Sequence, residues 1–286
     1  MFMNFSPIVE LSRRRFRATE GQVSWLYSAA LLATLPCFFA GATRMSNADT
    51  QRGAILAIHG LNAVAALLRG EDLRRRVVAI DACAAPGGKT IQLATALRDA
   101  GADAVVVANE PSSSRLGALV ANAVRCGVGP WLRCTRTTGQ KLFAALPREC
   151  ADFILLDAPC SGDTLARREG RGLAKHLRGQ PDAASMKEIV ATQLEIVRAA
   201  WPCLRPGGAL VYATCSLRPR EDEDIVDQVL KEFGDAALED LSGLAAGGDA
   251  TLRLWPQTHD SAGFFAAKLR KAGDGGGAAV ATDADE

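Results

Sequence analysis

The sequence predicts an α/β fold in which helices cover both faces of a doubly wound, mostly parallel sheet. Short apolar segments of strand length alternate along the chain with longer segments whose apolar residues recur at helical spacing. Three of the strand-like segments end in an acid and one in a thiol, as expected for a site at the carboxyl edge of such a sheet. Hydrophobic residues make up 48% of the chain, which suffices for one large core.

The composition excludes several classes of protein. A net charge of +1 over 286 residues gives no general attraction to nucleic acid, so any basic surface must be local. The eight cysteines occur singly and form no C-x-x-C pair, which argues against a metal site and against a disulfide framework. Reduced thiols predict an intracellular protein, with nucleus, cytoplasm and mitochondrion left open.

Three regions follow from the pattern: an N-terminal appendage over residues 1–72, the main domain over 73–271, and a disordered tail over 272–286 rich in Gly, Ala and Asp. Within the appendage, basic residues at 13–17 precede a mostly apolar stretch at 23–42. That stretch is interrupted by polar residues and a proline and begins far from the N-terminus. It therefore predicts either a buried helix or a targeting segment, and no stable membrane association.

The first strand of the main domain leads into a glycine turn. A helix is expected over 53–68, and Val77 to Ile80 then reads as a buried strand closed by Asp81. Pro86-Gly87-Gly88 predicts a tight turn close to a ligand, and Lys89-Thr90 opens a helix that ends near Arg98. This order binds nucleotide-like ligands, because the free backbone N–H groups of the helix point at them.

Two common nucleotide-binding fingerprints fail at this turn. A phosphate-binding loop needs glycine where Cys83 stands, and the dinucleotide pattern G-x-G-x-x-G is absent. The nucleoside S-adenosylmethionine uses the same place in the fold and has no phosphate to hold, so it remains as the ligand class.

The next strand, over 104–109, is followed by Glu110. An acid at this tip can accept two hydrogen bonds from a ribose diol, or it can simply cap the helix that starts near Ser113; the ligand role is favoured. A helix over 114–125 then leads to a short strand over 131–135.

Two later strands end in reactive side chains. The strand over 152–157 ends in Asp157 and continues into Ala158-Pro159-Cys160-Ser161-Gly162. A helix over 186–201 stops at Leu204-Arg-Pro-Gly-Gly, and a strand over 209–213 ends in Thr214-Cys215-Ser216.

These motifs resemble the RNA cytosine-5 methyltransferases of the Nop/Sun family over about residues 75–271. The resemblance rests on the glycine turn, the P-C-S-G and T-C-S motifs, and Pro219-Arg-Glu-Asp-Glu, the last of which is similar to the eukaryotic transfer-RNA branch. It implies a Rossmann-like methyltransferase sheet with an antiparallel last strand, formed by the tail 253–265. It also implies S-adenosylmethionine as cofactor, bound by Cys83, Ala84, Ala85, Pro86, Gly87, Gly88, Lys89, Glu110 and Asp157.

The family resemblance also implies the chemistry. Cys215 would attack carbon 6 of cytosine, because the addition makes carbon 5 nucleophilic enough to take a methyl group. Cys160 would serve in the later release, Asp157 would bind the cytosine edge, and Lys89 would steady the pyrimidine or the Asp157 charge. Free cysteines are more often small buried hydrophobes, but two at neighbouring strand tips favour catalysis.

RNA recognition is the part with the least support in the sequence. The family's usual acid after the third strand is replaced here by Thr137-Thr138-Gly139, and its large N-terminal RNA-binding part is missing or reduced to residues 1–72. Arg167, Arg168 and Arg171 form a basic run that is either an RNA contact or a solvated loop. The expected partners are RNA, with tRNA preferred, and a protein that supplies RNA recognition. The alternative is a non-catalytic methyl-donor- or RNA-binding relative within a complex; a DNA cytosine methyltransferase would lack Cys215.

Overall fold

A computed structural model describes residues 61, 62, 64, 68, 76–163, 182–242, 250–255, 258 and 263–273. Its strands are β1 (Val77–Asp81), β2 (Ala104–Asn109), β3 (Leu132–Thr135), β4 (Ala151–Asp157), β5 (Leu204–Thr214), β6 (Ala236–Glu239), β7 (Leu252–Leu254) and β8 (Phe264–Lys271). Its helices are α4 (Gly88–Asp99), α5 (Ser113–Arg125), α6 (Gly139–Ala145), α9 (Ala183–Ala200) and α10 (Glu223–Glu232). Short 3-10 turns are η3 (Gly129–Trp131), η4 (Trp201–Cys203) and η5 (Pro219–Glu221).

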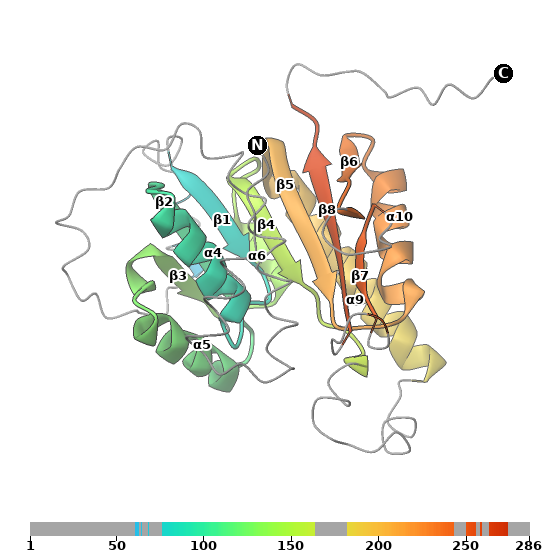
Figure 1. Cartoon of the computed structure of the whole chain (residues 1–286), viewed down its shortest axis with the longest axis horizontal. Helices are drawn as coiled ribbons and strands as arrows, with labels where there is room; N and C mark the ends of the chain where they lie inside the picture. Colours follow the sequence, from blue (N-terminus) through green and yellow to red (C-terminus); the bar gives the residue numbers. More distant parts are fainter. Residues whose placement is uncertain are drawn as a thin grey trace.

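The strands form one sheet in the order β3-β2-β1-β4-β5-β8-β6, with β7 also paired to β8 (Figure 1). Strands β1 to β5 are mutually parallel, whereas β8 runs antiparallel to β5 and to β6 and β7 on its other edge. The prediction of a mostly parallel Rossmann-like sheet with an antiparallel last strand is therefore confirmed.

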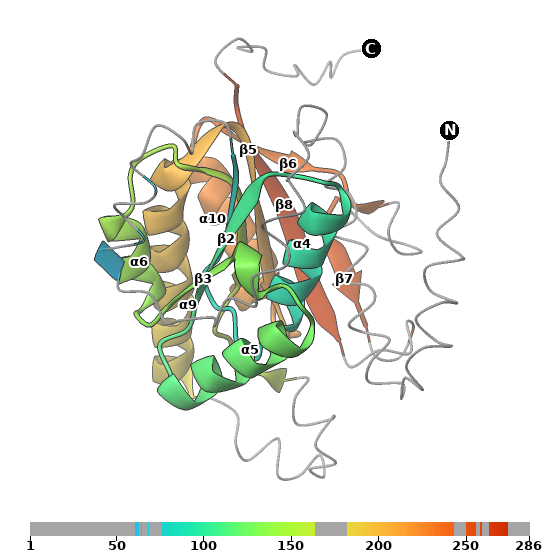
Figure 2. The same cartoon turned by 90° about the vertical axis from the view of Figure 1, so that its left-hand side faces the viewer.

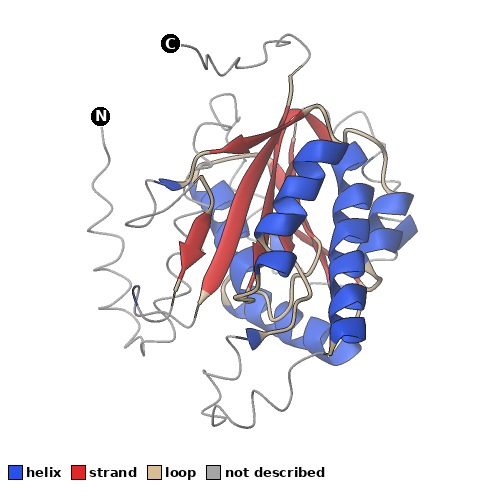
Figure 3. Ribbon diagram, turned by 90° about the vertical axis from the view of Figure 1, so that its right-hand side faces the viewer, coloured by secondary structure: helices blue, strands red, loops and turns tan. Residues whose placement is uncertain are grey.

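Alternate residues of each strand supply the two hydrophobic cores. In β1, Val78 and Ile80 enter the cluster built with α6, α9 and α10, whereas Ala79 enters the cluster built with α4 and α5. Figures 2 and 3 show the two groups of helices on opposite faces of the sheet. Both faces of the central strands are covered, which explains their continuous apolar sequences.

Strand β5 is longer than predicted. The segment Leu204-Arg-Pro-Gly-Gly was expected to end the preceding helix, but α9 stops at Ala200 and β5 begins at Leu204. The pairing to β4 shifts from Ala151↔Leu204 to Phe153↔Ala209, so these extra residues form an irregular start of the strand. Gly207, at φ 73°, takes the backbone conformation that the irregularity needs.

Most of the N-terminal region lies outside the described residues. Of the helix expected over 53–68, residues 61, 62, 64 and 68 are described and helical, and Val64 and Leu68 are buried in the core. The appendage boundary at 72, the stretch 23–42 and nearly all of the tail 272–286 fall outside the described ranges. Within the described ranges, no helix has the length and apolarity that a membrane span requires.

Candidate active site

The candidate site lies where neighbouring parallel strands end at one edge of the sheet. Strand β1 ends in Asp81, β2 is followed by Glu110, β4 ends in Asp157, and β5 is followed by Cys215. Because β1, β2, β4 and β5 are adjacent and parallel, the structure brings together residues that are far apart in the chain. This is the edge at which ligands bind in open α/β sheets.

Asp81 fastens the glycine turn to the start of α4. Its side chain is 1% exposed and accepts a hydrogen bond from Thr90 Oγ1 at 2.6 Å and one from the Cys83 N–H at 3.3 Å. Burial raises the pKa of Asp81 to about 7, although the Thr90 hydroxyl opposes the shift. Thr90 lies in the first turn of α4, so its hydroxyl joins the start of that helix to Asp81 at the end of β1.

Gly87 is the residue that the predicted tight turn requires. It has φ 106°, and a Cβ atom there would lie 2.6 Å from Leu119 Cδ1, so any other residue would be strained as well as crowded. Gly87 is also the N-cap of α4 and, as a glycine, supplies no side chain to cap the N–H groups of that helix. These donors remain at the end of the helix where an electronegative ligand atom is favoured.

The rest of the turn is held by hydrogen bonds to its own backbone atoms. The Ala84 N–H donates to the Asn109 carbonyl at 2.8 Å, and the Ala85 carbonyl accepts from Arg115 at 2.8 Å. The exposed Pro86 accepts at its carbonyl from Asn122 Nδ2, also at 2.8 Å. The loop predicted to hold the cofactor is thus fixed in shape by β2 and α5.

Glu110 is buried at the tip of β2 and orders the turn that leads into α5. It is 1% exposed, and its Oε1 accepts from the Ser112 N–H at 2.9 Å, so it orders the turn before α5. Its Oε2 lies 3.4 Å from Arg115, which also donates a hydrogen bond to the Ala85 carbonyl in the glycine turn. Ser112 itself is the N-cap of α5, so Glu110 is not the cap.

Asn109 is a positioning residue that the sequence analysis missed. Its buried amide donates to the carbonyls of Ala82 and Thr137, and its Oδ1 accepts from Thr135 Oγ1. It therefore joins the loops that follow β1 and β3. Thr138, in the segment that replaces the family's acid, serves as the N-cap of α6.

The Lys89 side chain is ion-paired to the last residue of β4. Its Nζ lies 2.8 Å from Asp157 Oδ2 and 5.4 Å from the centre of the Phe264 ring. Burial lowers the pKa of Lys89, but the Asp157 charge and hydrogen bond outweigh it, and a negative charge on Cys215 adds to the rise. Lys89 is therefore a cation paired to the last residue of β4.

The two motif cysteines face one another. Cys160 Sγ and Cys215 Sγ are 3.2 Å apart, and both side chains are partly exposed. This distance exceeds the ~2.05 Å of a disulfide, so the two sulfurs are hydrogen-bonded and not covalently bonded. The hydrogen bond to Cys215, reinforced by burial, raises the pKa of Cys160 well above its usual range.

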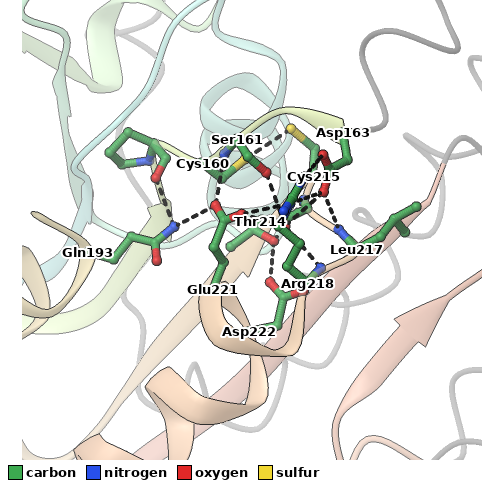
Figure 4. A network of polar contacts seen from close by, with 12 residues as sticks. Cys160, Ser161, Asp163, Gln193, Thr214, Cys215, Leu217, Arg218, Glu221 and Asp222 are labelled. Atoms are coloured by element: carbon green, nitrogen blue, oxygen red, sulfur yellow. Dashed lines mark hydrogen bonds and ion pairs between the residues drawn. The ribbon is translucent and has the colours of Figure 1, made fainter. Parts of the chain in front are cut away.

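A buried polar network surrounds these cysteines (Figure 4). It includes residues to which the sequence analysis gave no role: Asp163, Gln193, Ser216, Arg218 and Glu221. Glu221 belongs to the Pro219-Arg-Glu-Asp-Glu motif, but the sequence of this polar segment does not indicate that the Glu221 side chain is buried. The basic run Arg167, Arg168 and Arg171 lies outside the described residues.

The sheet order, the glycine turn after the first strand and the paired thiols define a Rossmann-like methyltransferase domain. Over residues 69–270 the chain matches the family described as 16S rRNA methyltransferase RsmB/F, and it belongs to that family. The RNA cytosine-5 methyltransferase resemblance inferred from the cysteine motifs is supported at this level.

The curated relatives are bacterial. The chain is 41% identical over 215 residues to the ribosomal RNA small subunit methyltransferase F of Erwinia tasmaniensis, a match covering 73% of this chain and 42% of the relative. The protein of the same name from Aeromonas salmonicida is 40% identical over 215 residues, covering 73% and 43%. The chain therefore spans less than half the length of these relatives. Their names give no support to the eukaryotic transfer-RNA branch.

Solved structures agree with this assignment. NSun6 from Pyrococcus horikoshii with SFG has a TM-score of 0.58 and 31% identity, covering 75% of this chain and 52% of that one. A methyltransferase homolog protein from Pyrococcus horikoshii has a TM-score of 0.55 and 29% identity, covering 68% and 62%.

Proposed function

We propose that this chain transfers the methyl group of S-adenosylmethionine to carbon 5 of cytosine in RNA through a covalent cysteine adduct. The observation that carries the proposal is the 3.2 Å separation of Cys160 Sγ and Cys215 Sγ at the tips of adjacent strands. The ion pair of Lys89 with Asp157 lies on the neighbouring side of the same edge. Two thiols beside an ion pair suit the chemistry of a cytosine ring, which must be activated by addition of a nucleophile before carbon 5 can be methylated.

The proposed first step is the addition of Cys215 to the base. Its sulfur forms a bond to carbon 6, and the electron pair of the 5,6 double bond moves toward carbon 5. Carbon 5 could then take the methyl group of the sulfonium, whose bonding electrons would stay with the donor sulfur as a neutral thioether. A thiolate is the nucleophilic form of cysteine, and a nearby cation favours it. Lys89, which is ion-paired to Asp157 at the same edge of the sheet, is the cation that we assign to this role.

The proposed second step is release, in which Cys160 removes the proton from carbon 5. The electron pair of that C–H bond re-forms the double bond, and the bond from carbon 6 to the Cys215 sulfur breaks. The hydrogen bond to Cys215 is the main cause of the raised pKa of Cys160. A Cys215 sulfur bonded to carbon has lost its negative charge, so the pKa of Cys160 falls at the step that needs a base.

The residues around the glycine turn fit the cofactor. When bound, S-adenosylmethionine supplies a methyl group on a positively charged sulfur. The N–H groups of Gly87 and Gly88 at the start of α4 offer hydrogen-bond donors, and Glu110 offers carboxyl oxygens to a ribose. Lys89 Nζ is engaged by Asp157 Oδ2 at 2.8 Å, which favours a nucleoside without phosphates.

The proposed substrate is ribosomal RNA of the small subunit. The transfer-RNA substrate expected from the Glu-Asp-Glu segment rests on that segment alone, whereas the family and its curated relatives are named for ribosomal RNA. RNA recognition by a protein partner, and an intracellular location, remain predictions from the sequence.

The test is a methyl-transfer assay with S-adenosylmethionine and three RNA substrates: small-subunit ribosomal RNA, assembled small subunits and total tRNA. Bisulfite sequencing then locates any 5-methylcytosine. We expect methylation of ribosomal RNA by the wild-type chain and none by Cys215→Ala. Methylation of tRNA alone would favour the transfer-RNA substrate predicted from the sequence. Binding of the methyl donor without transfer to any RNA would favour the non-catalytic alternative.

A further inference from the structure

A buried carboxyl group connects the two cysteine loops. Glu221, in η5, is 0% exposed and lies between the loop that carries Cys160 and the loop that carries Cys215 (Figure 4). Its Oε2 accepts a hydrogen bond from the N–H of Ser161, at 2.8 Å. Its Oε1 accepts from the hydroxyl of Ser216, also at 2.8 Å. One carboxyl group thus holds the residue that follows each cysteine.

A second buried side chain extends this connection to the other side of Cys160. Gln193, from α9, donates through Nε2 to Glu221 Oε2 at 3.3 Å and to the Pro159 carbonyl at 2.9 Å. The residues before and after Cys160 are therefore both tied to the pair of Glu221 and Gln193. The Glu221 carbonyl in turn accepts from the Tyr212 hydroxyl of β5 at 2.5 Å, which anchors the pair to the sheet.

Hydrogen bonds of this kind determine geometry more than they add stability. A buried carboxyl group costs several kcal/mol to desolvate and is retained only where donors satisfy it. Here the Glu221 carboxyl accepts from Ser161, Ser216 and Gln193, and its Oε1 lies 3.9 Å from Arg218 Nε. Ser161 directly follows Cys160, and Ser216 directly follows Cys215. The network therefore fixes the position of one loop relative to the other.

We propose that Glu221, acting with Gln193, is a positioning residue that sets the separation of the Cys160 and Cys215 sulfurs. The consequence for catalysis rests on the proposed function, because addition at carbon 6 and proton removal at carbon 5 act on adjacent atoms of one ring. Misplacement of a reacting group by about 1 Å costs about 100-fold in rate. The claim about sulfur separation stands without any RNA or cofactor.

The test therefore measures sulfur proximity directly. Hydrogen peroxide oxidises two thiols to a disulfide and is itself reduced to two waters. A disulfide requires the sulfurs to approach from 3.2 Å to about 2.05 Å, so its rate of formation depends on how the loops are held. The Cys160–Cys215 disulfide is quantified by alkylation and peptide mass mapping in the full chain, with folding checked by circular dichroism.

The central comparison is Glu221→Ala against Glu223→Ala. We expect the disulfide to form at least about tenfold more slowly in Glu221→Ala than in the wild type. Glu223 is the first residue of α10 and is ion-paired to Arg253 at 2.7 Å. Among the described residues no hydrogen bond joins its side chain to a cysteine loop, so its variant should oxidise at the wild-type rate. Glu221→Gln should recover part of the rate, because its amide oxygen can still accept from Ser161 and Gln193. Iodoacetamide labelling of Cys215 corrects each rate for changes in thiol reactivity.

Folded Glu221→Ala that forms the disulfide at the wild-type rate would overturn the proposal. Should this variant not fold, Gln193→Met and Glu221→Gln decide in its place, and unchanged oxidation in both would equally overturn it. In the methylation assay, Glu221→Ala should lower kcat by a larger factor than it changes KM. A wild-type chain without methyl transfer would refute the proposed function, yet the disulfide rates would still decide the positioning role.

Discussion

Cys160 Sγ lies 3.2 Å from Cys215 Sγ because β4 and β5 are neighbours in the sheet and end in register. Asp157, the last residue of β4, pairs with Ala213 near the end of β5, and each chain then turns away carrying its cysteine. The two sulfurs are therefore brought together by strand order, although fifty-five residues separate them in the sequence. This arrangement gives the pair two chemically different members, since the pKa of Cys160 is raised by its contact with Cys215.

The first prediction separates the roles of the two thiols. Cys215→Ala should abolish methyl transfer while leaving methyl-donor affinity nearly unchanged, because the nucleophile contacts only the base. Cys160→Ala should still attack and methylate, but release should stall. A protein–RNA adduct that survives denaturing electrophoresis should therefore accumulate in Cys160→Ala and vanish in the double variant. An adduct formed through Cys160 in Cys215→Ala would reverse the assignment.

The second prediction concerns the methyl donor. Glu110→Ala should weaken S-adenosylmethionine binding about 5- to 150-fold in calorimetry, equivalent to about 1–3 kcal/mol for unpaired ribose hydroxyls. Glu195→Ala is the control, since it removes an exposed carboxyl group of α9 that is hydrogen-bonded to Gln140. It should keep most of the affinity. Preferential binding of ATP by the wild-type chain would contradict the cofactor assignment and favour a phosphate-binding loop.

The sequence was sufficient for the features that depend on local pattern. Buried strands show as apolar runs, the turn at Gly87 shows as consecutive glycines, and acids or thiols at strand ends mark one edge of a parallel sheet. From these, the sheet and the edge that carries the site could be anticipated. The facing cysteines and the meeting of Lys89 with Asp157 were implied by the family resemblance.

The features that the sequence did not reveal depend on tertiary contacts. Gln193 lies in the middle of a helix, and only its burial against the Cys160 loop gives it a role. Asn109 is hidden in a strand whose apolar pattern drew attention to Glu110 instead. The irregular start of β5 follows from pairing with β4, whereas its Pro-Gly-Gly sequence favours a helix stop.

The third prediction tests the ion pair at the site. In a double-mutant cycle with Lys89→Met and Asp157→Asn, urea unfolding should give a coupling free energy of about 1 kcal/mol. This value lies between exposed and fully buried pairs, because the Lys89 and Asp157 side chains are 18% and 33% exposed. The neighbouring pair of Arg98 with Asp99 on the surface of α4, at 2.9 Å, is the control and should couple by close to zero. Equal coupling in the two pairs would refute a special environment at the site.

The last prediction uses the pH dependence of folding stability. Burial raises the pKa of Asp81 to about 7 in the folded chain, against about 3.9 for an exposed aspartate. The folded form therefore holds this proton more tightly than the unfolded chain does. The resulting stability is fully present below pH ~4 and is lost as the pH rises toward 7, at up to about 1.4 kcal/mol per pH unit.

Asp81→Asn isolates this contribution, because the amide does not titrate and its oxygen can still accept from Thr90. The difference in the free energy of unfolding, wild type minus variant, should fall by up to about 4 kcal/mol between pH 4 and pH 7 and then level off. Urea titrations at half-unit pH steps measure it, and the subtraction cancels the other titrating groups. A difference that stays flat or rises over this range would mean that the Thr90 hydrogen bond keeps the Asp81 pKa low despite burial.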